Sequence, residues 1–146
     1  MSAFRSPQRV YWEDTDAGGV VYYANYLKFL ERARTEWLRA QGFSQHELAQ
    51  EPGILFAVTS IEVSYQRPAR LDDELLVTCE LERAGGASLR FAQRVYRRAS
   101  GGTAGTQEEL LTTARVRVAC LDARTLRPLR LPDFLQDRLM QYEERA

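Results

Sequence analysis

The sequence has 146 residues, of which 20 are Lys or Arg and 20 are Asp or Glu, so its formal net charge is zero. This length is typical of one domain whose core needs no disulfide or metal to stabilise it. A zero net charge argues against a dedicated nucleic-acid-binding protein, which usually carries a basic excess, and it leaves self-association unopposed.

The cysteines and the hydropathy pattern indicate the compartment. Cys79 and Cys120 lie in apolar, strand-like segments, and two cysteines are too few for a disulfide scaffold. The first residues have no apolar signal-peptide core, and no apolar run approaches the roughly 18 residues of a membrane span. We therefore expect buried free thiols, a cytoplasmic location, no membrane span and no nucleic-acid partner.

In chain order, the first predicted element is a short strand at residues 9–12, where RVYW is rich in β-branched and aromatic side chains. A loop at 14–19 follows. From 21 to 40 the apolar residues recur at steps of three and four, which predicts a long amphipathic helix that ends at Gly42. The positions predicted to face the core are Tyr26, Phe29, Leu30, Ala33, Trp37 and Leu38.

A second, short helix is predicted to begin at Ser44, because Ser44 and Glu47 have the spacing of a capping box. This places His46, the only histidine of the sequence, in the exposed first turn of that helix. A Ser-His-Asp triad would need this histidine as its base, so we exclude that class of hydrolase.

After Pro52 the pattern changes to strands. Four segments with alternating or β-branched apolar residues are predicted as strands, at 54–66, 73–83, 88–98 and 110–122. The loops between the later strands are glycine-rich, at 84–87 and 99–106, and a final helix is predicted at 131–146 with Pro132 in its first turn. Short connections predict an antiparallel sheet, and the long helix must cover one of its faces. The predicted class is α+β, with two layers in a single domain spanning residues 1–146.

Three acidic residues, Glu13, Asp14 and Asp16, gather just before Gly18 and Gly19 and the start of the long helix. One explanation is a solvated turn whose charges stabilise the helix dipole. A calcium loop is a poor match, because its fifth position is a glycine and its twelfth is an asparagine where a glutamate is required. A magnesium phosphotransfer site lacks the accompanying phosphate loop.

A catalytic role is the sharper explanation of the same cluster. Backbone N–H groups at a helix N-terminus can hold a carbonyl oxygen as it gains negative charge. A carboxylate on the other side of that carbonyl can attack it or deprotonate a water molecule. Glycines let the backbone come close to a substrate, so the arrangement suits acyl transfer without a metal, serine or histidine.

The segment EDTDAGGVVYYANYLKFLERAR resembles hotdog-fold acyl-CoA thioesterases of the 4-hydroxybenzoyl-CoA thioesterase type, and most closely the YbgC-like branch associated with the Tol–Pal operon. The resemblance continues through IEVSYQRPARLDDEL, SLRFAQRVY and VRVACLDARTLRPLRLP, so it covers nearly the whole chain. It implies a five-stranded antiparallel sheet wrapped around a long central helix. It also implies an acyl-CoA substrate that is hydrolysed without a cofactor or metal ion.

The resemblance assigns roles to individual residues. It implies Asp16 as the catalytic carboxylate, acting as nucleophile or general base, and the backbone N–H near Tyr23 as the group that polarises the thioester carbonyl. Many relatives of the Tol–Pal branch carry histidine at the position of Tyr23, and the 4-hydroxybenzoyl-CoA enzymes can carry tyrosine. Further substrate contacts are implied at Gly19, Val20, Ser88 and Arg90.

Two other functions stay open beside thioester hydrolysis. The first is a non-catalytic module that binds acyl thioesters or acyl carrier protein, which is also a potential partner of the enzyme. The second is a hotdog dehydratase, although such enzymes usually need a histidine in the site, and His46 is misplaced for that role. An unpaired sheet edge further predicts a homo-oligomer, at least a dimer and more readily a dimer of dimers.

Overall fold

The computed structural model describes residues 4–98 and 108–145; the predicted glycine-rich loop at 99–106 lies outside these ranges. The described residues form a five-stranded antiparallel sheet with the strand order β1-β3-β4-β5-β2. The strands are β1 (Phe4–Arg9), β2 (Ile54–Tyr65), β3 (Glu74–Gly85), β4 (Ser88–Arg98) and β5 (Glu108–Asp122). The helices are α1 (Tyr26–Ala40), α2 (Gln45–Gln50) and α3 (Asp133–Arg145).

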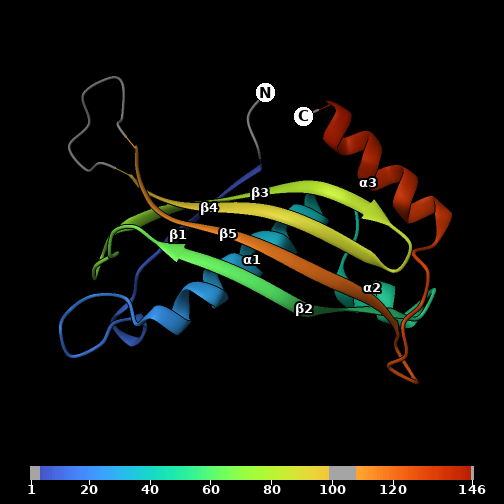
Figure 1. Cartoon of the computed structure of the whole chain (residues 1–146), viewed down its shortest axis with the longest axis horizontal. Helices are drawn as coiled ribbons and strands as arrows, with labels where there is room; N and C mark the ends of the chain where they lie inside the picture. Colours follow the sequence, from blue (N-terminus) through green and yellow to red (C-terminus); the bar gives the residue numbers. More distant parts are fainter. Residues whose placement is uncertain (1–3, 99–107, 146) are drawn as a thin grey trace.

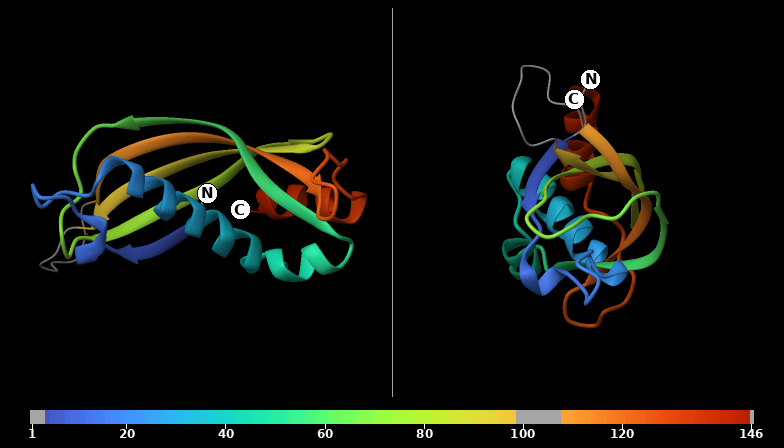
Figure 2. Two further views of the ribbon diagram at one scale, coloured as in Figure 1. Left: turned by 90° about the horizontal axis from the view of Figure 1, so that it is seen from below. Right: turned by 90° about the vertical axis from the view of Figure 1, so that its left-hand side faces the viewer.

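The sheet curls around α1, which lies along its concave face (Figures 1 and 2). The six positions that the periodicity assigned to the core are all buried. The predicted α+β architecture, a five-stranded antiparallel sheet around a long helix, is therefore confirmed. The C-terminal helix α3 covers a further part of the core through Leu135 and Leu139, which cluster with Leu131 just before the helix and with Trp37 and Cys79.

The predicted helix start at Val21 is wrong. The N–H groups of Val21 and Tyr22 donate to the carbonyls of Ala69 and Asp14, at 2.8 and 3.0 Å, so this backbone is engaged outside the helix. A short 3₁₀ turn at Tyr23–Asn25 then leads into α1. Both hydrogen bonds join Val21 and Tyr22 to other segments of the chain. The periodicity of apolar residues describes one helix and contains no information about such partners.

The predicted strand at 9–12 is also misplaced. The strand β1 ends at Arg9, where it pairs with Glu74 at the start of β3, and a 3₁₀ turn follows at Trp12–Asp14. The aromatic residues of RVYW therefore lie at a turn, with Tyr11 and Trp12 exposed.

The other predicted boundaries agree closely with the structure. The helix α1 ends before Gly42, whose φ of +95° is the left-handed conformation expected after a helix. The Ser44 hydroxyl accepts the Glu47 N–H at 3.2 Å and begins α2, which leaves His46 exposed as predicted. Cys79 and Cys120 are buried and form no disulfide within the described part of the chain, also as predicted.

Candidate active site

The acidic segment forms a tight loop between β1 and α1. The Asp16 N–H donates to the Val20 carbonyl at 2.9 Å, and the Gly19 N–H donates back to the Asp16 carbonyl at 3.0 Å. Gly19 has a φ of +79°, a conformation that favours glycine. The Asp16 carboxylate is exposed, and its Oδ1 accepts the Gly18 N–H at 2.8 Å. The turn therefore fixes Asp16 at the surface.

Asp14 has the opposite environment. Its side chain is only 4% exposed, and Oδ2 accepts the Tyr11 N–H at 2.8 Å. Its carbonyl accepts the Tyr22 N–H at 3.0 Å and an Asn25 side-chain N–H at 2.9 Å. Asp14 thus ties the acidic loop to the start of α1.

The 3₁₀ turn before α1 leaves two backbone N–H groups without an acceptor inside the turn. In the 3₁₀ turn the first internal hydrogen bond is the one from the Asn25 N–H to the Tyr22 carbonyl, at 2.8 Å. The N–H groups of Tyr23 and Ala24 precede it and have no acceptor within the turn. The resemblance implies that one of them, the N–H near Tyr23, polarises the thioester carbonyl. The turn places them where α1 begins, a few residues after the exposed Asp16 carboxylate.

The Tyr23 side chain is 63% exposed and lies among other tyrosines. Its ring centroid is 4.9 Å from that of Tyr22 and 6.4 Å from that of Tyr65. The Tyr65 hydroxyl donates to the Tyr23 carbonyl at 2.9 Å, which fixes the 3₁₀ turn against the end of β2. Burial raises the pKa of Tyr65, so this hydroxyl keeps its proton and remains a donor at neutral pH.

Residues 66–73, which connect β2 to β3, support the acidic loop from the other side. The Val21 N–H donates to the Ala69 carbonyl at 2.8 Å, and Val20 forms a bridge with Arg70. The buried Tyr26 hydroxyl accepts the Ala69 N–H at 2.9 Å. Burial raises the pKa of Tyr26. Sequence reasoning missed this support, because every partner is remote along the chain.

The predicted substrate contacts fall into two groups. Gly19 and Val20 belong to the acidic loop, whereas Ser88 and Arg90 lie at the start of β4, at the far end of the sheet (Figure 1). Along β3 the distance from Glu74, beside the end of β1, to Gly85, beside Ser88, is about 35 Å. One protomer therefore does not bring the two groups together.

Arg90 lies on the outer face of the sheet, exposed among other charged side chains. It is directly opposite Arg83 on β3 and Arg117 on β5. With Arg115, Arg117 and Glu82 it lines a shallow depression of about 330 Å³. Like charges directly across strands destabilise a sheet, so this row is a place where an anion would be stabilising.

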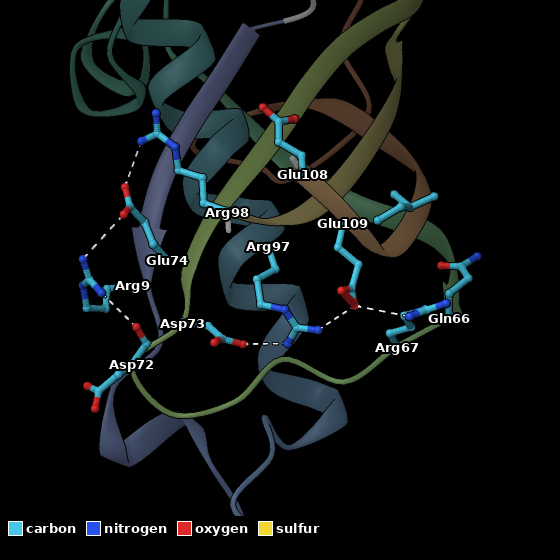
Figure 3. A pocket seen from close by; sticks show the side chains of 11 residues that line it. Arg9, Gln66, Arg67, Asp72, Asp73, Glu74, Arg97, Arg98, Glu108 and Glu109 are labelled. Atoms are coloured by element: carbon cyan, nitrogen blue, oxygen red, sulfur yellow. Dashed lines mark hydrogen bonds and ion pairs between the residues drawn. The ribbon is translucent and has the colours of Figure 1, made fainter. Parts of the chain in front are cut away.

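A second hollow, of about 920 Å³, lies at the end of the sheet near residues 66–73 (Figure 3). Its lining includes arginines and carboxylates joined by ion pairs, among them Arg97 with Asp73 and Glu109. No signal in the sequence singled out Arg97, because it sits in an alternating strand pattern where a charged residue is expected to face solvent.

An exposed carboxylate close in sequence to the N–H groups at a helix start is a combination that suits acyl transfer. Comparison with known proteins identifies the family. The Thioesterase-like superfamily matches residues 10–139 of the chain. The chain therefore belongs to the thioesterase-like superfamily.

Individual relatives support the same family and its hotdog fold. The chain is 46% identical to "Acyl-CoA thioester hydrolase YbgC" of Escherichia coli over 129 residues, 88% of this chain and 90% of that one. A crystal structure titled "Probable Thioesterase" from Bartonella henselae is 36% identical, has a TM-score of 0.78, and is matched over 90% of this chain and 100% of that chain. A 4-hydroxybenzoyl-CoA thioesterase mutant complexed with 4-hydroxybenzoyl-CoA has the same fold, with a TM-score of 0.82 at 22% identity and 94% and 98% coverage.

Among the described residues, no helix is both long and apolar enough to cross a membrane.

Proposed function

We propose that the chain hydrolyses the thioester of an acyl-CoA to a free acid and CoA. The observation that carries this proposal is the exposed Asp16 carboxylate, held by a glycine turn just before the orphan N–H groups at the start of α1, in a chain of the thioesterase-like superfamily. The name of the E. coli relative supports acyl-CoA as the substrate class.

In the proposed mechanism, the N–H of Tyr23 donates to the thioester carbonyl oxygen and stabilises the negative charge that develops there. Asp16 then acts in one of two ways. As a nucleophile it attacks the carbonyl carbon, the C–S bond breaks, and water later hydrolyses the resulting anhydride. As a general base it takes a proton from the attacking water. In both routes one water is consumed and the CoA thiolate leaves and is protonated.

The remaining substrate contacts require a second copy of the chain. The strand β2 is an edge of the sheet, with Val58 and Tyr65 exposed at 48% and 46%. We propose that two copies pair through β2 in antiparallel orientation to form a continuous sheet. Such pairing sets the Ser88 end of one copy beside the Asp16 end of the other, so that Ser88 and Arg90 can meet the CoA phosphates.

Light scattering tests this assembly directly. We expect at least a dimer at micromolar concentration, and a dimer of dimers as the fuller assembly. A Val58→Pro substitution removes a backbone donor from the edge strand and should shift the population towards the monomer, because proline cannot complete a ladder. A wild-type monomer would exclude the shared site. The proposed compartment is the cytoplasm, in keeping with two cysteines that are not joined in a disulfide.

A thiol-release assay across a panel of acyl-CoA thioesters, aliphatic and aromatic, tests the reaction. We expect CoA and free acid to be released in equal amounts, with multiple turnovers per protein chain. The panel should also include acyl thioesters of acyl carrier protein. Release of the carrier's thiol would make the carrier thioester a substrate, whereas binding without release would make the carrier a ligand. Binding of a thioester without turnover of any panel member would favour the non-catalytic binding module.

A further inference from the structure

Arg97 is the centre of the polar hollow shown in Figure 3. Its guanidinium contacts three separate positions. Nη1 donates to Asp73 Oδ2 at 2.9 Å and to the Pro68 carbonyl at 3.1 Å, and Nη2 donates to Glu109 Oε1 at 2.6 Å. The Arg97 side chain is 23% exposed, so these charge-assisted bonds are partly shielded from solvent.

Two of these contacts hold the connection at 66–73. Pro68 lies near its beginning and Asp73 lies at its end, directly before β3. The same Asp73 oxygen accepts the Arg70 N–H at 2.8 Å. Arg97 therefore fixes the connection from both sides, while its bond to Glu109 anchors the guanidinium to β5.

The connection in turn holds the acidic loop. Ala69 accepts the Val21 N–H at 2.8 Å, and Arg70 forms the bridge with Val20. The Val20 carbonyl accepts the Asp16 N–H at 2.9 Å. Only residues 66–73 and Val20 therefore stand between the Arg97 ion pairs and the backbone of the proposed catalytic aspartate.

The charges of the hollow favour a structural function over a ligand site. Arg9 and Arg98 pair with Glu74, at 3.7 and 3.0 Å, and Arg67 pairs with Glu109 at 3.6 Å. These cations are compensated by neighbouring carboxylates. An anionic ligand would have to displace existing ion pairs.

We propose that Arg97 is a positioning residue for thioester hydrolysis, clamping residues 66–73 so that they hold the Asp16 loop in its reactive geometry. The proposal rests on the proposed function of Asp16. Connections of this kind open locally more readily than sheet strands do. A displacement of about 1 Å at a reacting group can cost on the order of 100-fold in rate. The hydrogen bond with Asp73 raises the pKa of Arg97, so the clamp stays charged throughout the working pH range.

The test compares Arg97→Gln with Arg98→Gln. Both variants remove one positive charge from the same cluster, but Arg98 pairs with Glu74 and, among the described residues, makes no hydrogen bond or ion pair with residues 66–73. The measurements are kcat and KM with an acyl-CoA substrate, and amide hydrogen exchange of the segment 13–22.

For Arg97→Gln we expect kcat to fall about 10- to 100-fold while KM changes by less than about threefold, because geometry and not binding is lost. Amide exchange in 13–22 should become faster. Arg98→Gln should stay within about twofold in kcat and should leave exchange in that segment unchanged. Arg97→Lys should recover part of the loss, because an ammonium supplies one point charge but not the planar fork.

Three results would overturn the proposal: an Arg97→Gln kcat close to wild type, an equal loss in Arg98→Gln, or a loss without faster exchange in 13–22. If Arg97→Gln does not fold, Glu109→Gln releases one side of the guanidinium, and exchange in 13–22 decides. Amide exchange can be measured whether or not the protein turns over substrate, so the two proposals fail separately. An active Asp16→Asn would count against the proposed mechanism. Unchanged exchange of 13–22 in the Arg97 or Glu109 variant would count against the clamp.

Discussion

Replacing each aspartate of the acidic loop separately provides the most direct test of the proposed chemistry. We expect Asp16→Asn to lower kcat by about 10²- to 10⁴-fold, the range for removal of an acid–base group. This corresponds to about 3–5 kcal/mol of transition-state stabilisation. An amide can neither attack the thioester nor take a proton from water.

The same substitution should leave the fold intact. Asp16 is exposed, and its structural contact is the Gly18 N–H donated to Oδ1 at 2.8 Å, which the amide oxygen of asparagine can also accept. The expected change in the free energy of unfolding is within about 0.5 kcal/mol, as for other exposed positions. Substrate should still bind, so the variant should trap an acyl-CoA in a crystal.

Asp14→Asn is the matched control, and its expected effects are reversed. Asp14 is 4% exposed and accepts the Tyr11 N–H, so its charge contributes to a buried hydrogen bond. We expect a loss of about 1–2 kcal/mol in stability, because a charged acceptor is replaced by a neutral one. Activity should stay within a few-fold, because the Asp14 carbonyl that holds Tyr22 and Asn25 is unchanged.

The assays are steady-state thiol release for kcat and KM, and urea unfolding for stability. An active Asp16→Asn together with an inactive, folded Asp14→Asn would mean that the wrong carboxylate has been chosen. If both variants stay active, the acidic cluster is a helix cap and the catalytic group lies elsewhere.

Four further outcomes are expected. Replacing Cys79 and Cys120 together by alanine should leave kcat within a few-fold and cost about 1 kcal/mol of stability per site for the small cavities; complete loss with an intact fold would make one thiol the nucleophile. Burial raises the pKa of Cys120, so its alkylation in the native protein should be slow at neutral pH. EDTA should not reduce thiol release, and activity that is lost with EDTA and restored by Mg²⁺ would contradict the mechanism. Tyr23→Phe should keep kcat within about threefold if the backbone N–H acts; a loss near that of Asp16→Asn would assign the reaction to the phenol instead.

The sequence predicts the elements of this fold whose pattern is local. Helix α1 follows from its apolar stripe, and its end follows from Gly42, whose positive φ a side chain would disfavour. The start of α1 could not be predicted, since residues 21–24 are apolar and aromatic like the buried face of the helix itself. What takes Val21 out of the helix is a hydrogen bond to Ala69, and periodicity contains no information about that partner.

The candidate site is divided in the same way. The cluster of Asp16, the glycine turn and the helix start is contiguous in sequence, so its place in one loop could be predicted from the spacing. Arg97 could not, because its partners Asp73 and Glu109 lie 24 and 12 residues away. The strand β1 was misplaced for a related reason: its assignment depends on pairing with β3 and not on its own composition.

The structure also explains why the chain can gather acidic residues at this loop. The 3₁₀ turn at Trp12–Asp14 folds the Asp14 carboxylate back onto the Tyr11 N–H, inside the loop. The bridge between Thr15 and Val21 then carries the chain outward, and the glycine turn presents Asp16 to solvent. Each carboxylate therefore accepts a backbone N–H, from Tyr11 or from Gly18, and Asp16 is also exposed to water, which keeps the cost of placing the two charges close together low. Asp14 is not placed to take over from Asp16, because turning its carboxylate to the surface would break the hydrogen bond with the Tyr11 N–H and leave that N–H without its acceptor.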